Sequence, residues 1–345
     1  MIRNILLILL FAPVFLFAQK KEKKKKDGDV KFDTAYIKSF RHDITLKCYG
    51  NFKSNSITQY DGSHKILDYK INNPFRIGFG VSYKWFNLLA TLITPFPVNE
   101  YKKGKTDHFD IRLNMYGRRT VTDVWFQFYK GYYLANSNSI IPKWNNANAF
   151  YRRSDLDVAS FGGVMYFNLN KRRFSYKASF SQTDRQIKSS GAPIMGVNWS
   201  GFHVTGDSAL LPSALKADYT PEQRVQSITT FTLGLGGGYA YTYIFKKHWF
   251  ASLSGTVFVV GQTYNYLIEG NPAPRTHPGL NFNFLSRGAA GYNNDKNYYG
   301  LVFISDNIPL GKRLGSTFHY SFGTMNLMYA HRFSLDKIRY DKNPG

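Results

Sequence analysis

The stretch FRIGFGVSYKW, from Phe75 to Trp85, alternates large apolar side chains with small or charged ones. Successive side chains of a β-strand point to opposite faces, so this strand would have one apolar and one polar face. The same alternation recurs in segments of roughly ten residues, the length that crosses a bilayer as a tilted strand. The clearest examples are Phe109–Met115, Phe174–Phe180, Thr230–Tyr243 and Trp249–Val259. The pattern predicts an all-β protein.

The composition agrees with this prediction. The chain has 345 residues with 25 Tyr, 29 Phe and 29 Gly, and aromatic residues make up 17% of it. Aromatic residues favour strands, and a chain of this length can form a single large β unit. A soluble β-sandwich would alternate in the same way, with its apolar faces turned inward. Three features favour a membrane barrel instead: an export signal, aromatic residues near strand ends, and short turns alternating with long loops.

The N-terminus has the pattern of an export signal. Arg3 precedes an apolar run from Ile5 to Phe17, and Ala18 follows, which predicts a signal peptide over residues 1–18. The alternative, an uncleaved membrane anchor, would need roughly 20 apolar residues. Lys20–Lys26 holds six lysines and one glutamate, and such a run has nothing apolar to bury. We therefore predict a basic periplasmic linker over 19–38, an outer-membrane barrel over 39–335 and a short periplasmic tail over 336–345.

Turns and loops give the expected number of strands. Tight turns are predicted near 85–87, 117–120, 168–172, 246–248 and 293–296, and longer loops near 51–65, 95–106, 130–154, 182–227, 262–279 and 306–315. Outer-membrane barrels keep short turns in the periplasm and long loops outside. The alternation predicts a closed antiparallel transmembrane β-barrel of about 12 strands with both termini in the periplasm. Ala192–Val204 could be a further strand, and the count would then be about 14.

The formal net charge of the chain is +23. Clustered Lys and Arg with aromatic neighbours are typical of nucleic-acid-binding proteins, but the predicted export signal argues against that class. Arg3 contributes +1 and the lysine run +5, which leaves +17 for the rest. The anions of an outer membrane are lipopolysaccharide phosphates and solutes in the lumen, so lipid and lipopolysaccharide are the expected partners. A generally basic proteome would account for the charge equally well.

No motif in the sequence specifies a reaction. HExxH, a Walker loop and paired Cys or His at metal spacing are all missing, so no cofactor or metal is predicted. Cys48 is the single cysteine, which excludes an intramolecular disulfide. The GLGGG run at Gly234–Gly238 lies inside a strand pattern and indicates close packing. His319 and Ser321 share one strand face, as in a Ser/His hydrolase, but such a site also needs a third, orienting group.

Charged residues occupy the face that would line the barrel. The lumen-lining candidates are Lys47, Arg76, Lys84, Arg112, Lys177, Asp43, Asp110 and Asp123. One interpretation is that these side chains pair across strands and fill the interior, because an unpaired buried charge is costly. The other is that the excess of Lys and Arg lines a narrow path that prefers anions.

Two stretches of the chain resemble a known family. They are KRRFSYKASFSQTDRQIKSSGAPIMGVNWSGFHVTGDSALLP, from Lys171 to Pro212, and GYAYTYIFKKHWFASLS, from Gly238 to Ser254. Both are similar to an uncharacterised family of Bacteroidota outer-membrane proteins, a domain of unknown function. The likeness covers most of the chain after residue 40, and the words FSY, SQT, RQ and ALLP carry it. The resemblance implies export and a barrel but no activity. One departure is Ala192-Pro193, where bulkier apolar residues are expected.

Three classes of function remain open. The one we expect is a non-enzymatic outer-membrane barrel, channel-like or accessory, with a basic lumen. The first alternative is a lipid-modifying barrel enzyme, which would need Ser, His and a carboxylate or amide to converge on the lipid-facing surface or the rim. The second is a structural barrel whose outer loops, 130–154 and 182–227, dock another envelope protein. All three place the protein in the outer membrane.

Overall fold

The computed structural model describes residues 32–61, 64–73, 75–84, 86–93, 99–142, 144, 149–313 and 315–334. The predicted signal peptide, most of the predicted linker and the predicted tail lie outside these residues. The described end of the linker is paired: β1 (Ile37–Ser39) forms a two-stranded sheet with β9 (Asp184–Gln186).

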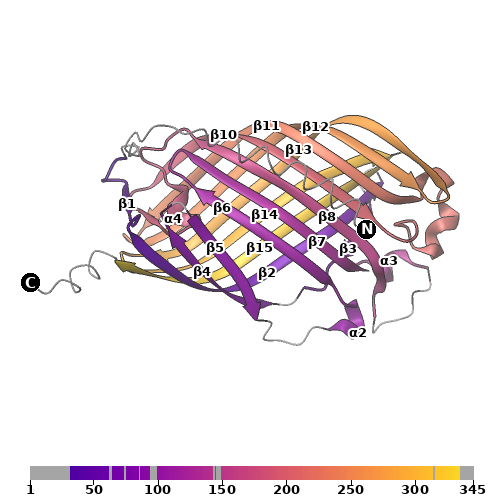
Figure 1. Ribbon diagram of the computed structural model, residues 1–345, viewed down its shortest axis with the longest axis horizontal. Helices are drawn as coiled ribbons and strands as arrows, with labels where there is room; N and C mark the ends of the chain where they lie inside the picture. The colour runs from indigo at the N-terminus through magenta and orange to yellow at the C-terminus, as the bar shows by residue number, and fades with distance from the viewer. Residues whose placement is uncertain are drawn as a thin grey trace, which may run out of the picture. The chain divides into compact units, whose positions relative to one another are not determined.

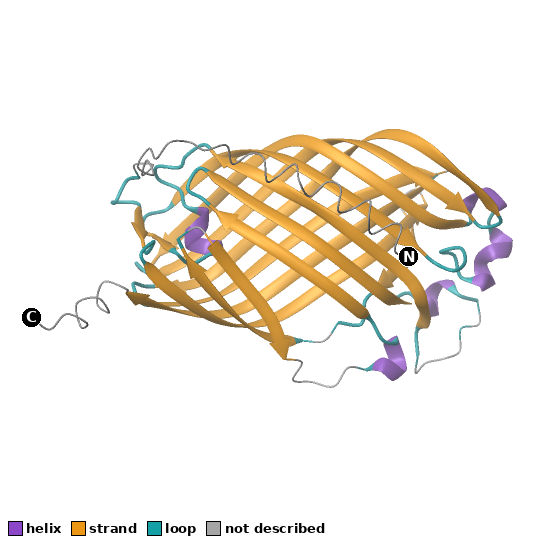
Figure 2. Ribbon diagram, in the orientation of Figure 1, coloured by secondary structure: helices purple, strands orange, loops and turns teal. Residues whose placement is uncertain are grey.

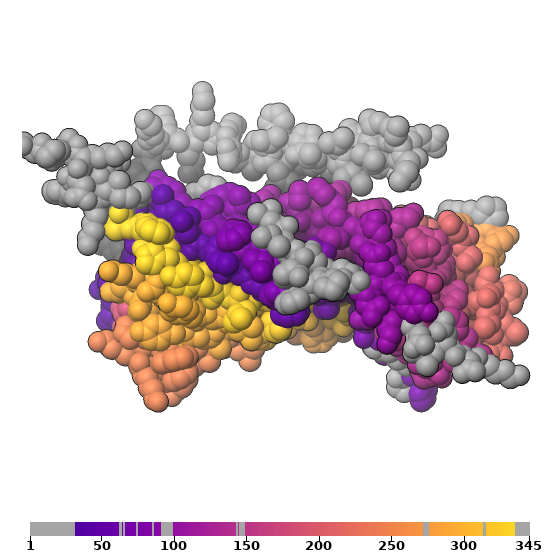
Figure 3. All heavy atoms as spheres, turned by 90° about the horizontal axis from the view of Figure 1, so that it is seen from below, coloured from indigo at the N-terminus to yellow at the C-terminus, as the bar shows by residue number. Residues whose placement is uncertain are grey.

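Twelve antiparallel strands close into a transmembrane barrel (Figures 1 and 2). In order around the ring they are β2 (Asp43–Asp61), β4 (Arg76–Tyr83), β5 (Phe86–Ile93), β6 (Asp107–Tyr116), β7 (Thr120–Leu134), β8 (Tyr151–Asn168), β10 (Ser190–Thr205), β11 (Val225–Phe245), β12 (Trp249–Ile268), β13 (Asn271–Asn293), β14 (Asn297–Arg313) and β15 (Ser316–Ser334). β15 pairs with β2 and closes the ring. Figure 3 shows this closure, with the indigo first strands beside the yellow last ones. The predicted fold class and strand count are confirmed.

Most of the predicted tight turns join neighbouring strands at one end of the barrel, which we call the turn end. Short connections link β4 to β5, β6 to β7, β11 to β12 and β13 to β14. Lys84, in the β4–β5 turn, has a φ of 55°, a left-handed conformation that two-residue hairpin loops require. The fifth predicted turn, 168–172, instead begins a longer segment.

That segment corrects the prediction of a strand at Phe174–Phe180. Tyr176–Phe180 form the short helix α4, which lies inside the barrel with all five residues buried. The strand is β10 instead, so Ala192–Val204 is a strand and the predicted loop 182–227 shrinks to 206–224. One strand replaces the other, and the count stays the same. The alternation misled because α4 is enclosed on all sides, and neither of its faces meets water.

Several predicted loops at the opposite end, the loop end, are strands or carry short helices. Residues 51–61, 262–268, 271–279 and 306–313 extend β2, β12, β13 and β14, well past the roughly 9 to 11 residues that cross a bilayer. β3 (His64–Lys70) pairs with β2 and β7 there. The predicted loops 95–106 and 130–154 carry the helices α2 (Glu100–Lys103) and α3 (Ser137–Ile140). Among the described residues, no helix has the length and apolar character needed to cross a membrane.

The outer face of the barrel is apolar. Leu233 and Leu235 of β11 are 64% and 69% exposed, and exposed Leu, Val and Phe side chains continue across the neighbouring strands. Toward the turn end, four aromatic residues are adjacent in register across β12 to β15, with ring centroids 5.0 to 6.5 Å apart: Trp249, Tyr292, Tyr299 and Tyr329. An apolar band edged by aromatic residues is typical of membrane barrels.

The barrel interior is filled in three layers. Near the turn end, an apolar cluster packs α4 against residues such as Tyr166. Near the loop end, the loop 206–224 inserts Leu210 and Leu211 into a second cluster. Between the clusters lies a polar layer in which Asn283 Nδ2 donates to Asn198 Oδ1 at 2.9 Å. The described side chains thus close both mouths of the barrel.

Candidate functional site

One seam of the barrel is incomplete. β5 and β6 share two register pairs, Phe86 with Met115 and Asn87 with Asn114. On its other side, β6 pairs with β7 along all ten of its residues. Beyond the two pairs, β5 and β6 diverge toward the loop end (Figure 1).

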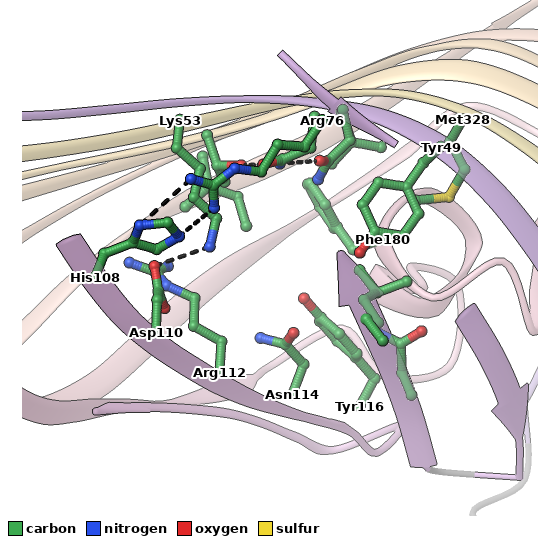
Figure 4. Close-up of a pocket in the computed structure, with 18 of the residues that line it drawn as sticks. Tyr49, Lys53, Arg76, His108, Asp110, Arg112, Asn114, Tyr116, Phe180 and Met328 are labelled. Carbon is green, nitrogen blue, oxygen red and sulfur yellow. Dashed lines mark hydrogen bonds and ion pairs between the residues drawn. The ribbon is translucent and has the colours of Figure 1, made fainter. Parts of the chain in front are cut away.

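A pocket of about 370 Å³ lies behind this seam (Figure 4). Its volume falls in the range of roughly 300 to 1,000 Å³ that is common for small-molecule sites. The lining residues are Tyr49, Asn51, Lys53, Arg76, Asn87, Leu89, Ala90, His108, Phe109, Asp110, Arg112, Asn114, Tyr116, Phe180, Val302, Ile304, Thr324, Asn326 and Met328. Ala90 and Phe109 are exposed on the barrel surface, so the pocket extends from the lumen to the outer face of the seam.

One oxygen of the pocket carboxylate, Oδ2 of Asp110, has three partners, whereas its buried Oδ1 has no hydrogen-bond partner among the described residues. Asp110 Oδ2 lies 2.9 Å from Lys53 Nζ, and it accepts hydrogen bonds from Gln127 Nε2 at 3.0 Å and from the Tyr129 hydroxyl at 2.7 Å. Asp110 is the single carboxylate among the described residues that line the pocket. Because Lys53 balances its charge, any further cation in the pocket adds net positive charge.

Two further cations, Arg76 and Arg112, form no ion pair among the described residues. Arg76 of β4 reaches across the seam, where its guanidinium lies against the imidazole of His108 on β6 and donates a hydrogen bond to one ring nitrogen. The Cζ atom of Arg112 lies 3.6 Å from the ring centroid of Phe322, and its buried Nε has no hydrogen-bond partner. A guanidinium group with free donors can bind a carboxylate or phosphate in a bidentate way. Both guanidinium groups thus retain donors that can bind an anion.

The opposite side of the pocket is apolar. Phe180 of α4, Val302 of β14 and Met328 of β15 contribute to it, together with Leu89 of β5. Figure 4 shows Tyr49, Phe180 and Met328 gathered on the side away from His108, Asp110 and Arg112. The pocket thus offers cations at one side and apolar side chains at the other.

Residues 31–333 match a family model, DUF4421, described as a domain of unknown function. The chain belongs to this family. The predicted resemblance to a family of unknown function is thereby confirmed. A comparison with curated proteins finds no match for this DUF4421 protein.

Solved outer-membrane barrels are similar to the DUF4421 chain at low identity. The outer membrane protease OmpT from Escherichia coli is 11% identical with a TM-score of 0.35, and the match covers 85% of this chain and 97% of that one. The Pseudomonas putida toluene transporter TodX is 7% identical with a TM-score of 0.26, covering 84% and 89%. The COG4313 outer membrane channel from Pseudomonas putida F1 is 10% identical with a TM-score of 0.27, covering 91% and 100%.

The structure brings some of the predicted lumen residues together and separates others. Arg76, Arg112 and Asp110 all line the pocket. Asp123 lies deeper in the barrel, where its Oδ2 is 2.5 Å from a guanidinium nitrogen of Arg287. Predicting these positions required only the strand alternation of β4, β6 and β7.

The remaining predicted residues lie near the turn end. Lys47 Nζ donates to Asn87 Oδ1 at 2.6 Å and to the carbonyl oxygen of Ser181 at 3.0 Å. Asp43 begins β2. Lys177 is on α4, not on a strand, and its Nζ donates to the carbonyl oxygen of Lys84 at 3.2 Å.

The prediction that Lys84 lines the lumen is wrong. It lies in the β4–β5 turn with its side chain exposed, and its Nζ lies 5.1 Å from the ring centroid of Tyr83. A turn residue follows the last pair of the ladder, so the alternation of the strand does not decide where its side chain points.

Sequence reasoning missed two basic residues of the pocket, Lys53 and His108. Lys53 falls in the predicted loop 51–65, although it continues the alternation of Lys47 and Asn51 on β2. His108 falls one residue before the predicted strand at Phe109–Met115, on the same face as Asp110. Extending each alternation by a few residues would have found both. Among the described residues, no three His, Cys, Asp or Glu side chains are placed to hold a metal ion.

In the structure, Asn307 lies beside both His319 and Ser321. Asn307 of β14 is the register partner of Ser321 on the outer face. His319 Nδ1 lies 3.1 Å from Asn307 Oδ1, and Asn307 Nδ2 donates to Ser321 Oγ at 3.2 Å. In the described structure, no hydrogen bond joins Ser321 to His319 itself.

Proposed function

We propose that this chain is a non-enzymatic outer-membrane barrel that binds an anionic ligand in its lumen. The observation that carries the proposal is that Arg76 and Arg112 share one pocket in which, among the described residues, the single lining carboxylate is paired with Lys53 and neither arginine forms an ion pair. Two guanidinium groups in a partly enclosed pocket attract an anion strongly. Of the two non-enzymatic roles, the packed mouths of the barrel favour an accessory, ligand-binding protein over an open channel.

Location in the outer membrane is part of this proposal. It is supported by the closed ring of strands, by the exposed apolar band and by the aromatic row from Trp249 to Tyr329. The export pattern over Met1–Ala18 agrees with it. With the turn end in the periplasm, the loop end would face outward, and lipid and lipopolysaccharide would be its neighbours.

The test is binding of a small anion to the refolded barrel in detergent micelles. The probe is butanoate labelled at its carboxyl carbon, and NMR follows the carboxyl resonance. We expect Arg112→Ala to weaken binding about tenfold, because a hydrogen bond to a charged group contributes roughly 1.5 to 3 kcal/mol. Lys130→Ala is the control, since Lys130 is 47% exposed and pairs with Asp157 outside the pocket. Equal affinity of wild type and Arg112→Ala would contradict the proposal.

A lipid-modifying activity is the second candidate, and the group formed by Asn307, His319 and Ser321 favours it. An amide oxygen beside Nδ1 is placed to orient an imidazole, as a carboxylate does in hydrolases. Ser321 would have to turn from Asn307 to His319 Nε2 to act as a nucleophile. Fatty-acid release from phosphatidylcholine vesicles tests this activity. It should be lost in Ser321→Ala and kept in Ser305→Ala, an exposed serine elsewhere on β14; equal release by wild type and Ser321→Ala would exclude Ser321.

A further inference from the structure

We infer that the incomplete seam between β5 and β6 is a lateral entrance, through which a single-chain anionic amphiphile reaches the lumen pocket from the bilayer. The inference rests on the proposed function, because it names the class of ligand for the same pocket. It adds that the ligand enters the pocket from the bilayer and that an apolar chain is attached to its anionic group.

Most of the backbone ladder between β5 and β6 is missing. Two register pairs join β5 to β6, whereas each other seam of the ring carries seven or more. Backbone N–H and C=O groups that face hydrocarbon without partners are costly, which is why membrane barrels close completely. An unpaired stretch in the wall therefore stands out as a feature that a purely structural barrel would lack.

The gap between β5 and β6 is bounded at both ends. At the turn end it stops at the pairs Phe86–Met115 and Asn87–Asn114. At the loop end it stops where Arg76 of β4 contacts His108 of β6, across the place that β5 would fill. About five residues of each strand lie between these limits, which is roughly 15 Å at about 3.3 Å per residue.

The edges of the gap are apolar on the outer face. Leu88 on β5 and Phe109, Ile111 and Leu113 on β6 are all more than 40% exposed and belong to the outer apolar face. Ala90, the smallest residue of the β5 edge, lines the pocket itself. On the outer face of the gap, an alkyl chain would therefore meet apolar side chains as it leaves the lipid.

Among the described residues, the ends of the barrel offer no comparable route. α4 closes the turn end, and the loop 206–224 closes the loop end through Leu210 and Leu211. In the part of the chain that the structure describes, the seam is thus the place where the pocket meets the surface.

The pocket itself defines the ligand. Arg76 and Arg112 would bind a carboxylate or phosphate head, while Leu89, Phe180 and Met328 would contact the adjoining alkyl chain. The cations lie toward the loop end and the apolar side chains toward the turn end. A lipid of the leaflet at the loop end has the same orientation, so it could enter without turning over.

The experiment closes the seam reversibly. Ala90→Cys and Ile111→Cys introduce cysteines that would face each other if the ladder continued, and Cys48→Ala removes the native thiol. The matched control keeps Ile111→Cys but pairs it with Phe126→Cys, its register partner on β7. The probes are palmitate and butanoate, both labelled at the carboxyl carbon and followed by NMR with the full barrel in phosphatidylcholine vesicles. Unlabelled hexadecanol, which has the chain without the charge, is the competitor.

Oxidation of the β5–β6 pair should weaken palmitate binding about tenfold or more, and reduction should restore it. Butanoate should still bind, because Arg76 and His108 remain accessible at the loop end of the gap. Hexadecanol should not displace palmitate. Unchanged palmitate binding after the disulfide has formed would overturn the lateral entrance. Loss of both anions would do so as well, since the gap would then not be selective for the chain. Failure of wild type to bind butanoate would instead refute the anion pocket.

A second variant covers the case in which the disulfide does not form. Ala90→Trp places a large ring in the gap, and Leu235→Trp places the same ring on the outer face of the fully paired β11. Palmitate binding should fall in Ala90→Trp and stay at the wild-type level in Leu235→Trp. Equal binding by these two variants would overturn the inference.

Discussion

Arg287 and Asp123 form the most enclosed ion pair of the barrel interior. They are 3% and 6% exposed, and Asn114 Nδ2 donates to the second carboxylate oxygen at 2.6 Å. Asp123→Ala would remove the carboxylate that pairs with the buried guanidinium, which costs about 3 to 5 kcal/mol. We expect a loss of that size in the free energy of unfolding, measured by denaturant titration in micelles. Asp123→Leu combined with Arg287→Met should lose much less, and a double variant as unstable as Asp123→Ala would contradict the explanation.

The apolar outer face predicts how single charges are tolerated. Leu253 is 62% exposed within the apolar band of β12, so Leu253→Arg would place a charge in lipid at a cost of about 2 to 4 kcal/mol near the midplane. The yield of folded, heat-modifiable barrel should fall. Thr263→Arg is the control, on the same strand and face but toward the loop end. Similar yields for the two variants would show that the band has been misplaced.

At the scale of elements, α4 shows where strand prediction fails. A period of two identifies a strand only when its faces meet different surroundings, and β11 or β12 satisfy that condition with lipid outside and small side chains inside. Phe174–Phe180 has the same period, but its residues pack against other side chains of the lumen. Burial on all sides removes the physical reason for alternation, so the sequence could not distinguish this helix from a strand.

The loop 206–224 is fastened to the barrel by Glu269. Its carboxylate accepts hydrogen bonds from Lys216 Nζ at 2.6 Å and from the backbone N–H of Ala209 at 3.1 Å. The hydrogen bond from Lys216 holds the pKa of Glu269 below its ordinary value of 4.5. Since the pKa is lower in the folded state, this contact stabilises the loop fully above pH 4.5 and is lost as the pH falls through the folded pKa.

Pepsin cleavage within 206–224 measures this effect, with the unfolded chain as the reference for the activity of pepsin at each pH. The relative cleavage rate should rise as the pH falls below 4.5 in the wild type. Glu269→Gln should show a higher rate above that pH and little further change below it. A wild-type rate that does not depend on pH would mean that other contacts hold the loop.

At the scale of the whole molecule, the filled interior predicts an electrically silent protein. Both mouths are closed by apolar clusters, and in the polar layer between them Asn283 and Asn198 share a hydrogen bond. Reconstitution into a planar bilayer should therefore give no steady conductance. Replacing Phe174, Tyr176 and Phe180 together by serine should loosen the turn end and produce intermittent current. A stable anion-selective current from the wild type would instead support an open channel.

The barrel could be predicted from the sequence because each strand carries its own alternation, whereas the pocket could not. Arg76 and Arg112 were identifiable as inward residues of separate strands. Whether the two arginines line one pocket depends on the separation of β5 from β6. The alternation within a single strand carries no information about which backbone pairs are missing between β5 and β6. The same holds for Asn307 and Ser321, which are brought together by the register of β14 with β15.

The barrel can close only after its last strand is available, because β15 pairs with β2. This seam joins Asp43–Asp61 to Ser316–Ser334, so nearly the whole described chain separates its two sides. Contacts so distant in sequence form slowly, because the intervening chain must first be brought together. Until the last strand is delivered, the nascent sheet has two unpaired edges, each able to join with another chain. A chain that stops before Ser316 should therefore accumulate as aggregates or chaperone-bound sheets. The final strand is thus the element that removes both exposed edges at once.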